Sequence, residues 1–340
     1  MASIALIDFS RAPTAKERKA LKGRLRRLRA EHFDEHLDTL TEKLISFERP
    51  GGPLRQSGLR IRTQFSSLAV PITGDSSDRK APPRAVRPPA TRVASGQSSA
   101  LRLELTALAL AQLHRRPGAK AHLFELGIPI TGSTNETGWA DLVAAQPIDT
   151  NNHGLLVTSR DKRARTVRSS LTTLDHAGLV TVPGSTRQLN RFENFALLNE
   201  IGTDVLGERQ EYTVPTNYEN QYTMPPGFIL NHWLHLLEDS EITVLLMAAC
   251  GRGAWTGDGL YAFPGVVRLL NYGIHRDPYS RARKTLEWLG LLRVDEVRRH
   301  SDGRAEDDVR YLHRIGLVPE AFNQPALPRM RKMIKEQLGR

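Results

Sequence analysis

Two clusters of basic side chains carry the clearest chemistry in this sequence, and each lies directly before a short apolar stretch. The first cluster comprises Arg160, Lys162, Arg163, Arg165, Thr166, Arg168 and Ser169. The second comprises Tyr279, Ser280, Arg281, Arg283 and Lys284. An arginine guanidinium can bridge O6 and N7 of a guanine with two hydrogen bonds, and lysine and hydroxyl side chains hold phosphates. The two clusters are therefore candidate sites for a polyanion, and for nucleic acid in particular.

The composition favours the same class of partner. The 340 residues include 48 Lys and Arg against 37 Asp and Glu, which gives a net charge of +11. A surplus of this size attracts nucleic acid or an acidic membrane surface. No apolar run approaches the ~18 residues of a membrane helix, and the N-terminus lacks the pattern of a signal peptide. We therefore expect a cytoplasmic protein that does not enter a membrane.

Patterns for catalysis or metal binding are weak. Cys250 is the only cysteine of the sequence, which excludes an internal disulfide and a Cys-rich zinc site. His32, Glu35 and His36 have the H-x-x-E-H spacing of one metalloprotease class, but the sequence offers no clear third ligand. We expect no catalytic residue, no metal and no cofactor. A metal-dependent hydrolase stays as an alternative.

The apolar spacing predicts a mainly helical protein with small β-hairpins, of the α+β class. Leucines from Leu21 to Leu44 recur mostly at steps of three or four and predict one long amphipathic helix, basic in its first half, within a first region, 1–50. Its apolar stripe is a candidate surface for forming a homodimer. The following region, 51–99, is rich in Pro, Ser and Arg and is predicted to be a disordered linker.

A repeated pattern divides the rest of the chain. "TLDHAGLVTV" from Thr173 and "TLEWLGLLRV" from Thr285 align without a gap. Each follows predicted helices and precedes a strand, a polar turn and a second strand. The repeat predicts two related domains, 100–204 and 217–316, followed by a basic tail, 317–340.

Each predicted domain has three helices and then a hairpin, and a Gly-Leu pair, Gly178-Leu179 or Gly290-Leu291, ends the third helix. This arrangement resembles the winged helix-turn-helix superfamily. The resemblance implies two winged-helix domains, in which the third helix carries a basic cluster into the major groove of DNA. It also implies that the hairpin tip, the wing, contacts a neighbouring phosphate or the minor groove. The wing residues would be Arg187 in the first domain and Arg298, Arg299 and Arg304 in the second.

Tandem winged helices in one chain also resemble plasmid replication initiators, in which two such domains contact repeated origin sequences. We therefore expect sequence-specific binding of double-stranded DNA by the replication initiator of a plasmid or another mobile element. A transcriptional regulator of the same architecture needs the same contacts, so the sequence does not separate the two. A winged-helix scaffold that binds proteins is a further alternative.

Overall fold

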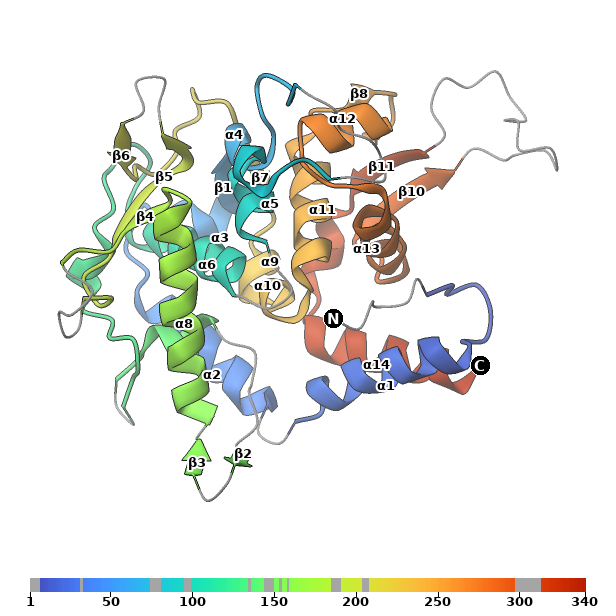
Figure 1. The fold of residues 1–340 in the computed structure, drawn as a ribbon, viewed down its shortest axis with the longest axis horizontal. Helices are drawn as coiled ribbons and strands as arrows, with labels where there is room; N and C mark the ends of the chain where they lie inside the picture. Colours follow the sequence, from blue (N-terminus) through green and yellow to red (C-terminus); the bar gives the residue numbers. More distant parts are fainter. Residues whose placement is uncertain are drawn as a thin grey trace.

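A computed structural model describes most of the chain, and the fold is of the α+β class, with many helices and small antiparallel sheets (Figure 1). The described residues are 7–30, 33–73, 81–94, 99–133, 136–143, 150–152, 155–157, 159–184, 191–203, 208–296 and 313–340. Two units with a similar order of elements form the body of the molecule.

The first unit packs three helices against a small sheet. Its third helix, α8 (Ser159–His176), contacts both α6 and α7, and it buries Val167, Leu171 and Leu174 completely. The other elements are α6 (Ala100–His114), η2 (Leu123–Leu126), α7 (Trp139–Val143), β2 (Thr150–Asn152), β3 (Leu155–Val157), β4 (Val180–Thr181), β5 (Ala196–Thr203) and β6 (Arg209–Glu211). Strands β4, β5 and β6 form an antiparallel sheet in that order.

The second unit has a related order, but its short strand pair lies between its first two helices, whereas that of the first unit lies between α7 and α8. Its long third helix, α13 (Arg276–Trp288), packs on α11 and buries Leu286 completely. The other elements are α11 (Asp239–Cys250), β8 (Ala254–Trp255), β9 (Tyr261–Ala262), α12 (Gly265–Leu270), β10 (Leu292–Glu296) and β11 (His313–Leu317). Its antiparallel sheet has the order β10-β11-β9-β8.

The third helices of the two units end in the same way. Gly178 and Gly290 have φ angles of 73° and 72°, in the left-handed region that glycine adopts without a side-chain clash. The N–H of the next residue then donates back to the helix, from Leu179 to the Leu174 carbonyl (3.0 Å) and from Leu291 to the Leu286 carbonyl (2.9 Å). This pattern is a Schellman motif. The predicted role of Gly178 after the helix is confirmed, and the aligned sequences fold alike.

Among the described residues, the sheets of the two units differ in strand number and in strand order. In the second unit β9 pairs directly with β11. In the first unit the strand that includes β6 continues past Tyr212, and it lies between β5 and a short extended segment at 119–121. There the Ala121 N–H donates to the Tyr212 carbonyl (3.1 Å), and the Tyr212 N–H donates to the Leu197 carbonyl (3.1 Å).

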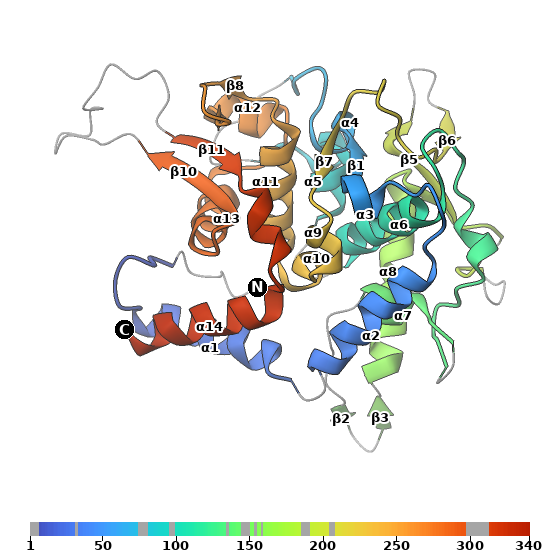
Figure 2. The same ribbon diagram turned by 180° about the vertical axis from the view of Figure 1, so that it is seen from behind.

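The prediction of one long N-terminal helix is wrong. The structure has α1 (Ala15–Leu28) and α2 (Phe33–Ser46), and α1 begins with a capping box between Thr14 and Glu17. Helix α1 packs against α14 (Ala326–Gly339), whereas α2 contacts α7 (Figure 2). The leucine stripe is continuous in sequence, but its two halves are buried on different partners, so the chain turns between them. Because this stripe is buried within the chain, it is not an exposed surface for a second copy.

The prediction of a disordered linker over residues 51–99 is also wrong for the stretches that the structure describes. Leu59, Ile61 and Phe65 are fully buried, because β1 pairs with β7 in an antiparallel sheet. Val93 is fully buried too. The elements of this region and its partner strand are α3 (Leu54–Ser57), β1 (Leu59–Arg62), α4 (Thr63–Ser66), η1 (Arg84–Val86), α5 (Pro89–Val93) and β7 (Gln221–Met224). A few apolar residues at suitable positions anchor a segment whose overall composition is that of a linker.

Short helices complete the fold around α11 and α14. The stretch "PPGFILNHWLHLL" (225–237) has the sequence pattern of one helix. The chain instead has a break at His232, whose φ is 67°. The imidazole Nε2 of His232 lies 2.6 Å from the Thr41 hydroxyl, and the Trp233 indole N–H donates to the Gln324 carbonyl (3.1 Å). The elements are α9 (Gly227–Leu230), α10 (Trp233–Leu236) and η3 (Pro319–Asn323). The predicted basic tail therefore folds as η3 and α14 and packs on the body.

Candidate nucleic-acid interface

Helix α8 presents part of its predicted basic cluster to solvent. Ala164, Val167 and Leu171 define its buried side. The members of the cluster that are exposed are Arg160, Arg165, Arg168 and Ser169. Basic and hydroxyl side chains on the outer face of a helix are suited to contacts with phosphates and base edges.

The remaining members of the first cluster are partly buried. The Arg163 guanidinium lies 3.8 Å from a carboxylate oxygen of Asp141 on α7, and its side chain is only 16% exposed. The Thr166 hydroxyl donates to the Lys162 carbonyl (2.9 Å) within the helix, and Lys162 is half-buried. Arg163 and Thr166 therefore contribute to the structure of α8 more than to its outer surface. Arg187 lies outside the described residues.

Two residues of the second cluster are buried, so their prediction as DNA contacts needs correction. Tyr279 and Arg283 are 7% and 4% exposed, because they share a face of α13 with Leu286. Arg283 forms an ion pair with Glu296 on β10 (2.5 Å). The Arg268 guanidinium lies over the Tyr279 ring, 5.1 Å from its centroid. Both side chains thus hold α13 in place.

The outer side of α13 keeps a smaller basic set. Ser280, Arg281 and Lys284 are half-buried, and Arg276 at the start of the helix is exposed. The sequence favours Asp277 as the N-cap, with Pro278 at the first helical position. The N-cap is instead His275, so Arg276 belongs to the helix and adds to this set. The predicted wing residues of this unit, Arg298, Arg299 and Arg304, lie outside the described residues.

The charges around the start of α13 act on His275. Burial lowers the pKa of His275 most strongly, Asp277 raises it, and Arg87, Arg268 and Arg281 lower it further. Three arginines from three different elements thus oppose a further positive charge at this position. The carboxylate of Asp277 offsets part of this positive charge.

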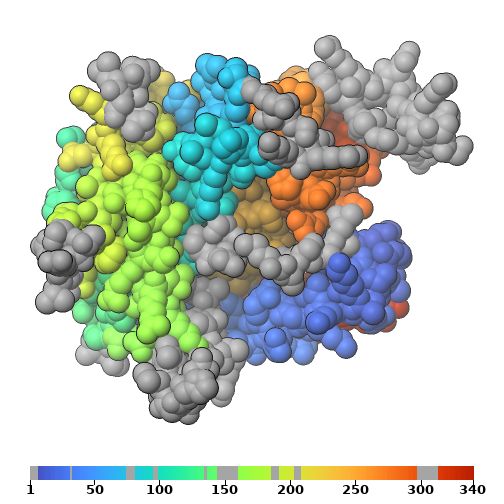
Figure 3. Space-filling model, viewed as in Figure 1, coloured from blue at the N-terminus to red at the C-terminus, as the bar shows by residue number. Residues whose placement is uncertain are grey.

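The two third helices lie on one face of the molecule. Helices α8, α5, α13 and α1 all face the viewer in Figure 1 and lie behind the other elements in Figure 2. Figure 3 shows the surface of this face, which we call the front face. Helix α1 adds further exposed basic side chains, namely Lys16, Lys19, Lys22, Arg26 and Arg29. Segment 81–94 lies between the two units and adds Arg84, Arg87 and Arg92, which sequence reasoning assigned to a linker.

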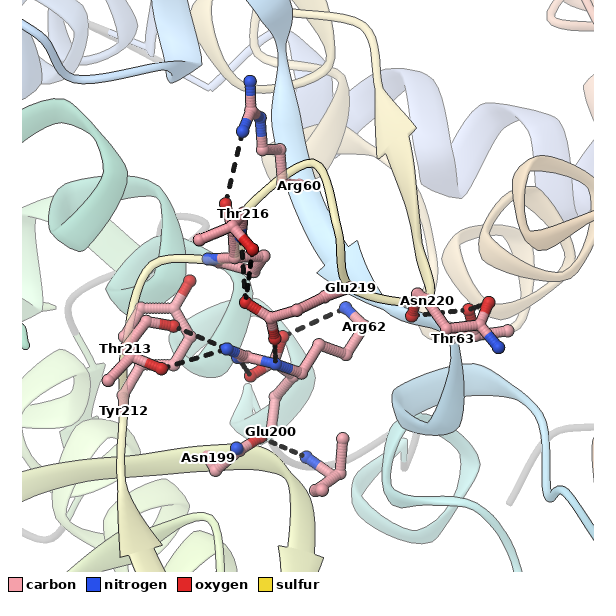
Figure 4. A network of polar contacts seen from close by, with 12 residues as sticks. Arg60, Arg62, Thr63, Asn199, Glu200, Tyr212, Thr213, Thr216, Glu219 and Asn220 are labelled. Carbon is pink, nitrogen blue, oxygen red and sulfur yellow. Dashed lines mark hydrogen bonds and ion pairs between the residues drawn. The ribbon is translucent and has the colours of Figure 1, made fainter. Parts of the chain in front are cut away.

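A buried ionic cluster around Arg62 is the other concentration of charge (Figure 4). The Arg62 guanidinium pairs with Glu200 (2.8 Å) and Glu219 (2.5 Å) and donates to the carbonyl and hydroxyl oxygens of Thr213 (both 3.0 Å). Burial raises the pKa of Glu200, and the charge of Arg62 opposes that rise. Nearby, burial and the charge of Glu200 raise the pKa of Glu104 well above its usual value.

This cluster has the groups but not the access that acid–base chemistry needs. Both Glu104 and Glu200 are 0% exposed, so no solvent-borne substrate reaches either carboxylate. Neither Glu104 oxygen has a hydrogen-bond partner in the described structure. The cluster ties β1 to β5 and to the chain around Thr213, and its role is structural.

The described part of the chain contains no clear site for metal binding or for thiol chemistry. No group of three or more His, Cys, Asp and Glu side chains there could hold a metal ion, and His32 lies outside it. Burial raises the pKa of the Cys250 thiol to about 11, so at neutral pH it is protonated and a poor nucleophile. None of the helices in that part is long and apolar enough to span a membrane.

Comparison with known proteins gives no relative for this chain. No protein-family model, no curated protein sequence and no solved structure matches it. Its function is therefore argued from the front face itself.

Proposed function

We propose that this chain binds double-stranded DNA through its front face, with α8 and α13 as the third helices of two winged-helix units. The observation that carries the proposal is the repetition of one local arrangement. In both units a basic helix ends in a Schellman motif at a glycine and leads into an antiparallel strand pair. A third helix with outward basic residues, followed by a hairpin, is the arrangement that winged-helix proteins use in the major groove.

The charge distribution supports a nucleic-acid partner. Arg165 and Arg168 on α8 and Arg276 on α13 are exposed on elements of the same face, and the whole chain carries a net charge of +11. A duplex that crosses this face would meet both helices, and its two contacts would lie at separate half-sites. The chain supplies positioning and charge for such binding, and no catalytic step is part of the proposal.

Within this class we propose replication initiation for a plasmid or another mobile element. This narrower proposal rests on the resemblance of tandem winged helices to plasmid initiators. A transcriptional regulator with the same contacts is the second candidate. The two differ in where the recognised sequence lies, at a replication origin or at a promoter.

The experiment is a binding selection from fragmented genomic and plasmid DNA, followed by titration of the enriched fragments over a salt series. We expect one repeated sequence to be enriched, with affinity that falls steeply as salt rises. Arg165→Ala and Arg168→Ala should each cost about 1–3 kcal/mol of binding free energy where the side chain contacts a guanine. Binding with no enriched sequence would reject sequence-specific recognition, and no binding at low salt would reject the proposal.

The control variant carries Lys332→Ala and Lys335→Ala. Both lysines are exposed on α14, which lies on the opposite side of the molecule from α8 (Figure 2). The variant removes two positive charges without touching the front face. It should keep the affinity and sequence preference of the parent chain, so a comparable loss in this control would mean that only net charge matters.

A further inference from the structure

Segment 81–94 connects the two units on the front face. The Thr91 hydroxyl donates to the Tyr272 carbonyl (2.9 Å) just before α13, and the Arg92 guanidinium donates to the Ala177 carbonyl (3.4 Å) at the end of α8. The segment thus spans the distance from the end of one third helix to the start of the other.

The packing around this segment is close. A Cβ atom on Gly273 would lie 2.9 Å from Cγ of Arg87 and 3.0 Å from the Thr91 hydroxyl oxygen. Gly273 also has a φ of 68°, so a larger residue there would be strained and would push the segment outward. Val93 and Ala90 are buried beneath it. The segment therefore has a fixed place between the units.

The three arginines of the segment have no acidic partner among the described residues. Arg84 donates to the carbonyls of Arg92 and Ala94, Arg87 donates to the Pro82 carbonyl, and Arg92 donates to the Arg87 carbonyl. No Asp or Glu occurs between residues 81 and 94.

Three of the buried or half-buried arginines elsewhere in the chain have carboxylate partners. Arg24 pairs with Glu241, and Arg62 and Arg283 pair with glutamates. In the segment, by contrast, burial and the charge of Arg84 lower the pKa of Arg87, and burial lowers the pKa of Arg92. Arg84 and Arg87, which pair with no carboxylate among the described residues, repel each other, and an approaching anion relieves this repulsion.

We infer that Arg84, Arg87 and Arg92 form a phosphate-binding site that holds the DNA backbone between the two third helices. The inference rests on the proposed function and adds a contact that reads no sequence. Main-chain carbonyls fix one side of each guanidinium, and Arg84 is exposed, so its remaining N–H groups can donate to phosphate oxygens. A guanidinium that is already oriented loses less conformational entropy when it binds.

The test uses the full chain with the double substitution Arg84→Gln and Arg87→Gln, and the enriched DNA and a random duplex of equal length as ligands. The slope of log K against log salt is negative, and each lost phosphate contact makes it less steep by about 0.9. In the double variant the slope should therefore be less steep by about 1.8. Affinity should drop on the order of ten-fold for both duplexes, which leaves their ratio unchanged. The charge-matched control is Lys332→Gln with Lys335→Gln, which should change neither quantity.

A footprint supplies a second readout. Hydroxyl-radical cleavage of the enriched DNA should show protection at both half-sites and on the backbone between them. In the double variant the protection between the half-sites should be lost while that at the half-sites remains. The variant with Arg84→Lys and Arg87→Lys keeps the charges and should retain most of the affinity, which separates loss of charge from loss of folding.

The outcomes distinguish this inference from the proposed function. An unchanged salt slope in the double variant, together with weaker binding by Arg165→Ala, would overturn the phosphate site and leave DNA binding intact. Loss of sequence preference in the double variant would also overturn it, because a backbone contact cannot discriminate bases. Failure of the parent chain to bind any duplex would reject both. Binding to vesicles that contain phosphatidylserine, lost in the double variant while DNA binding is unaffected, would assign the segment to a membrane surface instead.

Discussion

The buried ionic cluster around Arg62 gives the most stringent test of how this structure is held together. Arg62→Ala removes the partner of Glu200, which is 0% exposed, and it removes two hydrogen bonds to Thr213. Breaking a buried pair from one side typically costs about 3–5 kcal/mol, because the remaining charge is buried without compensation. Glu219 is 33% exposed at its side chain, so water can solvate it and it adds little to the cost.

The loss of stability caused by Arg62→Ala should depend on pH in a defined direction. In the variant, burial raises the pKa of folded Glu200 without opposition from Arg62, whereas in the unfolded chain Glu200 ionises near its usual value. The unfolded state then binds fewer protons than the folded state over the interval between the two pKa values. The free energy of unfolding of Arg62→Ala therefore falls as pH rises through that interval, and the difference from the parent chain is smallest at acid pH.

The assay is urea unfolding followed by circular dichroism at several pH values. We expect a loss of about 3–5 kcal/mol near neutral pH. The double variant Arg62→Met with Glu200→Gln removes both charges and should recover much of this loss. Lys120→Ala is the control, because its ion pair with Glu211 joins side chains that are 63% and 49% exposed, and it should cost less than about 1 kcal/mol. A loss below ~1 kcal/mol for Arg62→Ala, or one that is constant with pH, would refute the argument from buried charge.

Three further predictions concern the two third helices. Gly178→Ala and Gly290→Ala should each lower the free energy of unfolding by about 1–2 kcal/mol, measured by urea unfolding, because both glycines have φ near 70°; no loss would contradict the shared Schellman motif. Arg283→Ala should cost about 1–2 kcal/mol of stability, because it removes a buried side chain from under α13, while the lost ion pair adds little since Glu296 is 50% exposed. Arg281→Ala, in contrast, should leave thermal unfolding unchanged and weaken DNA binding. Burial lowers the pKa of His275 most strongly and neighbouring arginines lower it further. Phosphates that offset the arginines should raise this pKa, so DNA affinity should increase as pH falls from about 7 to about 5. His275→Gln should abolish this dependence, and a pH profile equal to that of the parent chain would assign the effect to another group.

The parts of the fold that sequence reasoning predicted correctly depend on local signals. The Gly-Leu pair after each third helix predicts both the end of the helix and the strand that follows, since only a few residues near Gly178 and Gly290 determine that geometry. The steps of three and four residues from Val167 to Leu174 likewise indicate from the sequence alone which side of α8 is buried. The same spacing places Arg165, Arg168 and Ser169 on the opposite side, and their side chains are exposed in the structure.

The errors arise where distant parts of the chain decide the outcome. No local feature near Leu59 or Val93 indicates that β7 and the two units will bury these side chains. The proline-rich composition of the region therefore predicted disorder there. The break between α1 and α2 depends on their packing partners, which lie far away in the sequence. Helix α1 packs on α14, near the end of the chain, and α2 contacts α7.

The misplacement of Tyr279 and Arg283 has a different origin. Counting back from Leu286 in steps of three or four reaches Ala282 or Arg283 and then Tyr279, so the sequence contained the signal that both face the core. The density of basic residues on this helix concealed it, because charge suggested a surface where the helical period indicated a buried face.

The packing of segment 81–94 also bears on whether the two units can move relative to each other. If a flexible tether joined them, the second unit would search a volume around the first, and its effective concentration would be set by the length of the tether. Here Thr91 and Arg92 form hydrogen bonds to the two units, which hold the units in one relative position. Under the proposed DNA binding, the two helices would therefore act as one bivalent ligand of fixed span. A pair of binding sites that is shifted around the double helix by half a turn is accommodated only by twisting the DNA, so the spacing of the sites becomes part of what is recognised.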